Sequence, residues 1–448
     1  MRASALLDRF QHPAQVLATA FGAVVLAGTA LLASPLATTT GQPADWLTAL
    51  FTATSAVCVT GLIVVDTASY WSGFGEVVII MLVQVGGLGI MTLASLFTVF
   101  ISGRLGFRAR LFAQAESKLL SVADLRRLTR NVAVFSLVSE VITAAILTPR
   151  FMLEYGESFG RALYLGVFHS ISAFNNAGFA LWPDSLIRFA SDPWICVTIT
   201  LAVVLGGLGF PVVFELLRSW RRPSRWSLLT RLTLTVTAVL VTSGTILLTA
   251  TEWTNPGTFG PLDDGSKIMA GVFAAVMPGS GGFNTVDVAQ MYPSSWLVTD
   301  LLMFIGGGSA GTAGGIKVTT AGLLVFIVWT EVRGERQVNI GRRRLAESTQ
   351  RQVVALVVMS ATLISLATYT LLVLSPHSLD QVLFEVISAY GTSGLSTGIT
   401  AEATMAGTLL LTLLMFVGRI GPLTVGSALA LKDRPRHYEL PEERITVG

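Results

Sequence analysis

The chain has 448 residues, of which 52% are hydrophobic and 13% are charged, and its mean hydropathy is +0.67. Soluble domains carry roughly 25% charged residues, so this composition excludes an ordinary water-soluble fold and predicts an integral membrane protein. The formal charge of +3 does not indicate nucleic-acid binding, because the basic residues gather in loops between apolar segments. Cys58 and Cys196 lie in apolar segments and are predicted to be free thiols.

Eight apolar segments are predicted to cross a bilayer, which takes about 20 residues per helix. In chain order they cover residues 16–32, 77–101, 132–151, 194–217, 228–250, 296–329, 353–374 and 405–430. The first segment is long enough to remain as a span rather than a cleaved signal peptide. The positive-inside rule places both termini and the Lys- and Arg-rich loops in the cytoplasm. The basic segments are 104–130, 218–231, 333–351 and 432–444.

One pattern recurs four times between these segments. A Phe in a short apolar segment is followed by a Gly nine or ten residues later, in the pairs Phe51 and Gly61, Phe168 and Gly178, Phe273 and Gly282, and Phe384 and Gly394. Each short segment has about three helical turns, too few to cross a bilayer about 30 Å thick, which predicts a re-entrant helix. Each is preceded and followed by a span. The predicted fold is therefore an all-α membrane protein with four units of span, re-entrant pore helix and span around one pseudo-fourfold pore. The units cover 1–103, 104–220, 221–334 and 335–432, and a cytoplasmic tail covers 433–448.

The stretch after each re-entrant helix contains glycine and no acidic side chain. Non-helical backbone at membrane depth is tolerated only where protein buries it or where it lines a watery cavity. Four such stretches around one axis would direct carbonyl oxygens at a central line, which is the geometry of a cation filter. A carboxylate site for a divalent ion is disfavoured. The predicted potassium-binding residues are Val59, Thr60, Gly61, Asn176, Ala177, Gly178, Ser280, Gly281, Gly282, Thr392, Ser393 and Gly394.

The sixth apolar segment contains a glycine-rich stretch at 306–315, which we call the glycine loop. Each Gly costs about 1 kcal/mol relative to Ala inside a helix, so the helix is predicted to break into a flexible loop within the membrane. A phosphate-binding Walker loop is excluded, because Lys317 is preceded by Ile316 and followed by Val318. The predicted gate residues are Gly306, Gly307, Gly308, Gly311, Gly314, Gly315, Lys317 and Arg419.

Arg419 stands within the last apolar segment, where a lone Arg costs about 2.5–3.5 kcal/mol on insertion scales. We expect it to face the pore, to hold the glycine loop shut through the free carbonyls of that loop, and to repel cations. The alternative is a helix-end residue that snorkels toward the inner surface. Lys317 has the same alternative interpretation.

Six motifs resemble signatures of the Trk/Ktr/HKT superfamily of potassium transporters. They are the filter stretches 59–62, 175–179, 282–285 and 392–398, the glycine-rich stretch 306–317, and the stretch 418–424. The resemblance covers nearly the whole chain and is strongest to the membrane subunit of bacterial Ktr systems. The chain departs from the family in the third filter stretch, where Met-Pro-Gly-Ser-Gly at 277–281 stands in place of the usual Arg-Thr-Ala before Gly-Phe.

The resemblance implies potassium uptake across a bacterial plasma membrane, with potassium at the filter, sodium as a candidate activator, and no covalently bound cofactor. It also implies a homodimer in membrane lipid, which binds a separate cytosolic ring of nucleotide-binding regulatory subunits. The alternative function is a sodium-coupled secondary transporter of another solute, which would show two related halves instead of four quarters. An enzyme is disfavoured, because none of the four His residues forms an acid-base or metal-ligand pair with a neighbour.

Overall fold

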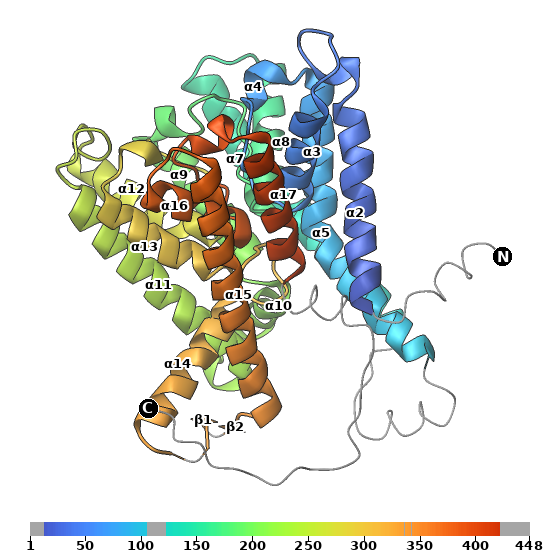
Figure 1. Cartoon of the computed structure of the whole chain (residues 1–448), viewed down its shortest axis with the longest axis vertical. Coiled ribbons are helices and arrows are strands. Elements are labelled where there is room, and N and C mark those ends of the chain that lie inside the picture. The colour runs from blue at the N-terminus through green and yellow to red at the C-terminus, as the bar shows by residue number, and fades with distance from the viewer. Residues whose placement is uncertain (1–12, 105–121, 336, 342, 422–448) are drawn as a thin grey trace.

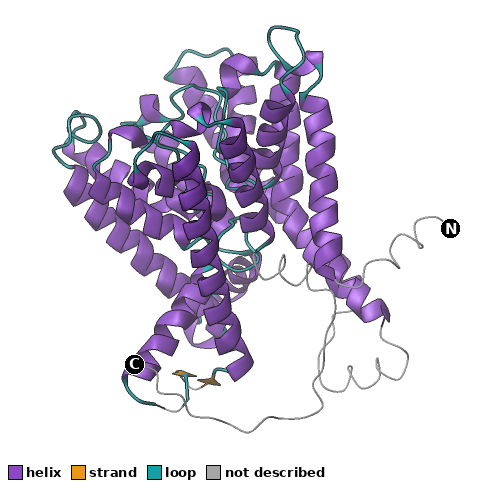
Figure 2. Ribbon diagram, viewed as in Figure 1, coloured by secondary structure: helices purple, strands orange, loops and turns teal. Residues whose placement is uncertain are grey.

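The structure is a computed structural model that describes residues 13–104, 122–335, 337–341 and 343–421. Long helices stand side by side, and shorter helices lie among them toward the upper end of the molecule (Figure 1). Loops gather at that upper end (Figure 2). The described part contains one antiparallel hairpin, formed by β1 (Asn339–Ile340) and β2 (Arg343–Arg344) near the lower end.

Most of the predicted spans coincide with single long helices. Three described helices are long and apolar enough to cross a membrane, namely the Thr129–Leu153 part of α7, α11 and α15, and a bent helix pair makes a fourth. Several remaining spans correspond to helices with shorter apolar parts, such as Gly73–Gly89 of α5. The single helices are α2 (Pro13–Leu32), α5 (Gly73–Arg104), α7 (Val122–Leu153), α11 (Leu228–Glu252), α15 (Glu347–Leu374) and α17 (Met405–Ile420).

The predicted continuous span 194–217 is wrong, because the chain bends there by 103° between α9 (Pro193–Gly207) and α10 (Phe210–Ser219). Gly209 lies at the bend with φ 90° and ψ 135°, a conformation that a residue with a Cβ rarely adopts. Pro211 follows in the first turn of α10, where its missing N–H is tolerated. The bend leaves backbone groups at the end of α9 available to other parts of the chain.

The predicted break in span 296–329 is confirmed. Helix α13 (Pro293–Phe304) ends before the glycine loop, and α14 (Val318–Val332) begins after it. Helix α17 ends at Ile420, where Gly421 has φ 92° and ψ 138°, nearly the conformation of Gly209. The predicted continuation to 430, the tail 433–448 and part of the basic segment 104–130 lie outside the described residues.

Four short helices match the predicted re-entrant segments. Each begins with a side chain that caps the free N–H groups of its first turn. Asp45 and Asp263 accept two backbone N–H groups each, Ser158 accepts one, and Ser378 forms a capping box with Gln381. The bond from the Ser266 hydroxyl holds the pKa of Asp263 below its usual value. The helices are α3 (Trp46–Val57), α8 (Phe159–Phe174), α12 (Asp264–Val276) and α16 (Leu379–Gly391); one further turn, α4 (Thr67–Tyr70), follows α3.

Buried apolar side chains form two large clusters that enclose the short helices. One includes residues of α2, α3, α5, α8 and α9, and the other includes residues of α11, α13, α15, α16 and α17. Large apolar side chains are also exposed around the bundle, for example Leu137 at 61% and Tyr369 at 70%. Such an extended apolar exterior is typical of a surface that faces lipid. Cys58 and Cys196 are buried free thiols, as predicted.

Candidate functional site

The four glycine-containing stretches share one backbone conformation. In each, a positive φ occurs at two residues. One is the glycine at 61, 178, 282 or 394, which we call the ring Gly, and the other is the residue two positions before it. The earlier residue also donates its N–H to the carbonyl three residues back, for example Val59 to Ala56 at 3.1 Å. The same turn therefore ends all four short helices. The φ pairs are 54° and 91° for Val59 and Gly61, 61° and 70° for Asn176 and Gly178, 87° and 73° for Ser280 and Gly282, and 50° and 87° for Thr392 and Gly394.

The four stretches meet in a closed ring. A Cβ on each of the four glycines would lie 3.2 Å or less from the carbonyl oxygen that precedes the Gly of the next stretch. The contacts run from the first stretch to the second, third and fourth, and then back to the first. A side chain at any of these positions would displace a ring carbonyl. The four contacts are Gly61 with Ala177, Gly178 with Gly281, Gly282 with Ser393, and Gly394 with Thr60.

The third stretch reaches the ring by a tighter path. In the other three, the residue before the Gly donates its N–H to the carbonyl five residues back, as Thr60 does to Ser55 at 2.8 Å. In the third, the helix ends in a 3-10 turn at Met277–Gly279, and Gly281 donates to Met277 at 2.7 Å. This tighter turn absorbs the one residue by which the Phe-to-Gly spacing is shorter. The departure of 277–281 from the family motif therefore leaves the ring closed.

Carbonyl oxygens are the cation ligands that this ring offers, and they suit a weakly hydrated monovalent ion. Within the residues the structure describes, no three His, Cys, Asp or Glu side chains come together as a metal site. The C-terminal ends of the four short helices lie at the ring, where their partial negative charge favours a cation.

Two polar side chains behind the ring were not identified from the sequence. His169 and Glu385 are fully buried, and each directly follows the repeated Phe of its short helix. His169 Nε2 accepts the N–H of Leu181 at 3.2 Å, and Glu385 accepts the N–H of Thr397 at 2.8 Å. Each of the two side chains thus binds the backbone N–H of the residue three positions after a ring Gly. The sequence feature that could have identified both residues is an imidazole or charged side chain within an otherwise apolar short helix.

Glu385 makes the more extensive set of contacts, because the hydroxyls of Ser396 and Thr400 also donate to it, at 2.5 Å each. Glu385→Leu should leave these donors unpaired, a loss of about 1–3 kcal/mol per buried group, and loosen the fourth stretch. We expect the potassium-to-sodium flux ratio to fall at least fivefold in reconstituted vesicles. Glu402→Leu is the control, because Glu402 is exposed. An unchanged ratio in Glu385→Leu would assign Glu385 to helix stability alone.

The glycine loop is closed at its base. Gly306 donates its N–H to Ile316 at 2.7 Å, and Val318 donates to Gly307 at 3.1 Å. Ile305 and Ile316 form a parallel β-bridge at the same place. The two ends of the loop therefore lie side by side, and the loop leaves and re-enters the helical path between α13 and α14 at one point.

The bend between α9 and α10 anchors the glycine loop. Gly308 donates its N–H to Gly207 at 2.7 Å, and Thr312 donates to Gly206 at 3.2 Å. Both acceptors lie in the last turn of α9, where the bend has removed their helical partners. Gly206 also packs closely against the carbonyl of Phe174.

The glycine loop lies directly against the fourth stretch. A Cβ on Gly314 would collide with the Thr392 hydroxyl, and one on Gly315 would lie 3.2 Å from Gly391 Cα. Lys317 donates its ammonium group to the carbonyls of Ala313 and Gly314, the second at 3.3 Å. The alternative in which Lys317 snorkels away is therefore wrong, because its charge folds back over the loop.

Arg419 joins three parts of the site. Its side chain is 4% exposed, and it donates to the carbonyl of Thr312 in the glycine loop and to that of Gly86 in α5, the latter at 3.0 Å. These bonds keep the guanidinium within the bundle, so the snorkelling alternative is wrong for this residue too. Two charge-assisted bonds partly compensate the cost of burying the charge.

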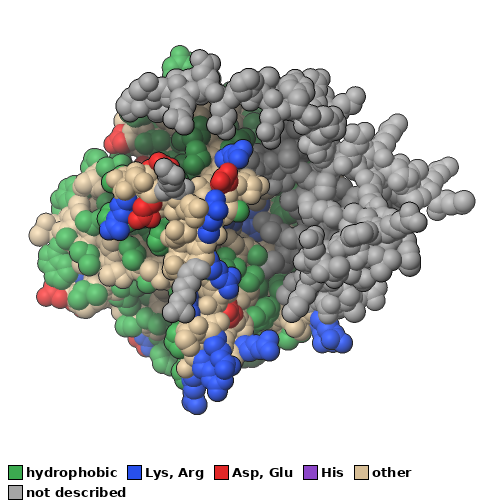
Figure 3. All heavy atoms as spheres, turned by 90° about the horizontal axis from the view of Figure 1, so that it is seen from below, with side chains coloured by type: hydrophobic (Ala, Val, Ile, Leu, Met, Phe, Trp, Pro, Cys, Tyr) green, Lys and Arg blue, Asp and Glu red, His purple; other side chains and the backbone are tan. Residues whose placement is uncertain are grey.

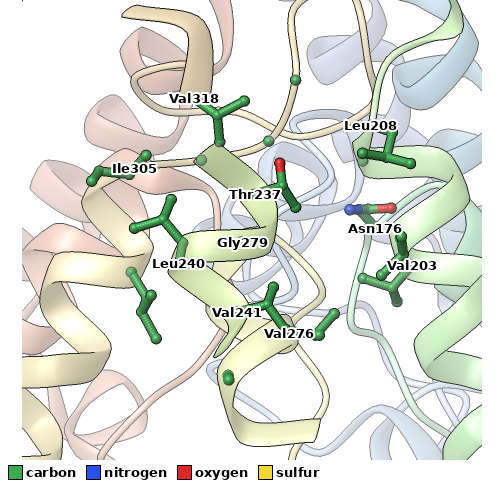
Figure 4. Close-up of a pocket in the computed structure, with 17 residues that line it drawn as sticks. Asn176, Val203, Leu208, Thr237, Leu240, Val241, Val276, Gly279, Ile305 and Val318 are labelled. Atoms are coloured by element: carbon green, nitrogen blue, oxygen red, sulfur yellow. The ribbon is translucent and has the colours of Figure 1, made fainter. Parts of the chain in front are cut away.

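A small cavity of about 70 Å³ lies beside the first part of the glycine loop, among residues of α9, α11 and α12. Figure 4 shows Asn176 on one side and Leu240, Ile305 and Val318 on the other. Most of its walls are apolar.

A bundle of apolar helices that closes four carbonyl-bearing stretches into a ring defines a helical membrane protein of the cation-transport class. The chain belongs to the TrkH family of cation transport proteins, whose family model matches residues 2–434. It is 39% identical to the Ktr system potassium uptake protein B of Bacillus subtilis, over 97% of both chains. It is 36% identical to the protein of that name from Vibrio alginolyticus, over 97% of this chain and 94% of that one.

Two further proteins extend this comparison. The chain is 32% identical to the potassium/sodium uptake protein NtpJ of Enterococcus hirae, over 97% of both chains. The crystal structure of the potassium transporter TrkH from Vibrio parahaemolyticus has the same fold, with a TM-score of 0.72 and 17% identity over 92% of this chain and 85% of that one.

Proposed function

We propose that this chain takes up potassium ions across the plasma membrane of a bacterium, through a filter made by the four ring stretches. The closed ring of carbonyls at Thr60, Ala177, Gly281 and Ser393 carries this proposal. Four span, pore-helix and span units surround the one pore. The names of the relatives, which specify potassium uptake or potassium and sodium uptake, support the choice of ion.

The glycine loop is the gate in this proposal. It lies between the ring and the Arg-rich side, and its bonds to Gly206, Gly207 and Arg419 keep it across the path. Lys317 adds a second positive charge, which disfavours cations below the ring. The gate opens when the loop leaves these partners, and the flexibility of its glycines permits that movement.

The chain is, in this proposal, the translocating subunit of a Ktr-type system. It forms a homodimer and binds a separate cytosolic ring of nucleotide-binding regulatory subunits. The lower face, where Lys and Arg side chains gather (Figure 3), is the cytoplasmic face and supports this docking. Both termini are then cytoplasmic. Potassium is the transported ion, and sodium acts as an activator.

Ion flux in a purified system tests the function. The full chain in lipid vesicles should carry potassium at least tenfold faster than sodium under equal gradients, because ring carbonyls discriminate between dehydrated ions. Protein-free vesicles give the background. Equal fluxes of the two ions, or sodium flux that requires a second solute, would replace the proposal with the secondary-transporter alternative.

A further inference from the structure

A second cavity lies on the Arg-rich side of the molecule, between α11 and α14. We propose that it binds an anionic phospholipid of the cytoplasmic leaflet, whose phosphate meets arginines at the rim and whose acyl chain lies against the base of the glycine loop. The inference rests on the proposed membrane orientation. No ring residue lines this cavity, and Ile305, at the base of the glycine loop, is the point at which it reaches the gate.

The cavity has a volume of about 1060 Å³, enough for a large part of a phospholipid. Helices α11 and α14 form its walls and lie next to one another in the lower part of the molecule (Figure 1). The walls are mostly apolar, and Val239 and Val325 are 60% and 67% exposed. In a membrane these side chains open the cavity sideways to lipid. An acyl chain can therefore enter from the bilayer without crossing a polar barrier.

The rim of the cavity is positively charged. Arg225, Arg231 and Arg343 line it, against one carboxylate, that of Glu215. Glu215 is already engaged, because it accepts the N–H and the hydroxyl of Ser227 at 2.7 and 2.6 Å. Among the described residues, neither Arg225 nor Arg343 has an ion-pair partner. The rim therefore offers a net positive charge to an anion.

Arg231 is held in place at this rim. Its Nη2 donates to the carbonyl of Ser224 at 2.7 Å and to that of Pro223 at 3.2 Å, which fixes the guanidinium beside Arg225. Trp226 also lines the cavity, and aromatic side chains of this kind favour the headgroup level of a bilayer. Basic pockets between membrane helices on the cytoplasmic side suit phosphate headgroups. A soluble anion would use the rim and leave the apolar walls exposed to water.

The inner end of the cavity touches the gate. Ile305 lines both this cavity and the small cavity beside the glycine loop, and it pairs with Ile316 at the base of that loop. An acyl chain against Ile305 would support the loop in its present position. Because a ligand stabilises the conformation to which it binds, the lipid should favour the closed loop.

Thermal unfolding of the purified full chain in neutral detergent measures lipid binding without any transport. We expect phosphatidylglycerol to raise the unfolding temperature at concentrations at least tenfold below those at which phosphatidylcholine acts. Glycerol phosphate and inorganic phosphate should have no such effect. If either soluble anion matched phosphatidylglycerol, the site would be an anion site and the lipid proposal would be wrong.

Two variants test the location. The first is a triple variant that should weaken the phosphatidylglycerol effect about tenfold, and it combines Arg225→Gln, Arg231→Gln and Arg343→Gln. Its control is a second triple variant that should leave the effect unchanged, because its three arginines do not line the cavity, and it combines Arg218→Gln, Arg221→Gln and Arg222→Gln. Thr235→Trp keeps every arginine and fills the exposed wall, so it should abolish the effect as well. Equal losses in the two arginine triples, or a full effect in Thr235→Trp, would overturn the proposal.

The functional consequence is measured separately by ion flux. In vesicles of phosphatidylcholine, addition of one quarter phosphatidylglycerol should lower the basal potassium flux of the chain severalfold, and Thr235→Trp should remove this dependence. Unchanged flux would reject the contact with the gate. Failure of potassium transport in every lipid would instead reject the proposed function, since the unfolding experiment would still report lipid binding.

Discussion

Arg419→Ala is expected to raise potassium flux at least tenfold in vesicles and to leave the potassium-to-sodium ratio unchanged. The variant removes the bonds to Thr312 and Gly86, so the glycine loop loses its link to α17, while no hydrogen bond joins this side chain to a ring residue within the described part of the chain. It also removes a buried positive charge that disfavours cations below the ring. Flux should therefore rise through the gate alone.

Arg419→Lys and Arg333→Ala are the matched controls for this prediction. Lysine keeps the charge and loses the two-pronged bonding, so it should give an intermediate flux if both bonds and charge hold the gate. Arg333 is exposed at the end of α14 and should have no effect. A fall in flux, or a changed ion ratio, would make Arg419 a structural residue that supports the filter.

Gly61→Ser is expected to lower the potassium-to-sodium flux ratio about tenfold or more. Gly61 has φ 91°, where a residue with a side chain costs roughly 1–2 kcal/mol. Its new Cβ would collide with the carbonyl oxygen of Ala177, a member of the ring. The collision displaces that carbonyl, and a widened ring discriminates less between ions.

Gly41→Ser separates backbone strain from filter geometry. Gly41 also has a positive φ, 69°, but a Cβ there would meet no atom within 4 Å. The two variants thus share the conformational cost, and Gly61→Ser alone affects the ring. Normal ion ratios in a well-expressed Gly61→Ser protein would show that the ring does not select the ion.

Local features of the sequence predicted much of this fold. The four short apolar segments predicted four short helices, and the structure adds that each begins at a capping residue, namely Asp45, Ser158, Asp263 or Ser378. The density of glycine at 306–315 predicted a break, because glycine destabilises a helix wherever it lies. These signals depend on neighbours within a few residues, so they can be interpreted without knowledge of the rest of the chain.

The bend between α9 and α10 was not predicted from the sequence, which indicated a continuous span at 194–217. The first unit has Gly86-Gly87-Leu88-Gly89, the same order as Gly206-Gly207-Leu208-Gly209, yet α5 continues through it. In the second unit the glycine loop stabilises the bent conformation, because Gly308 and Thr312 donate their N–H groups to the carbonyls that the bend leaves free. The two sequences thus differ in structure for a local and a tertiary reason, because only the second has a proline, Pro211, and only the second meets the glycine loop.

The sequence by itself determined the four short helices, the glycines that follow them and the broken sixth span, because capping, hydrophobicity and glycine content act over a few residues. The tertiary structure alone decided which carbonyl each ring Gly meets, how His169 and Glu385 hold the outer segments, and which group Arg419 binds. The bond from Arg419 to Thr312 joins residues 107 positions apart. Such contacts form when whole helices pack, so no local pattern specifies them.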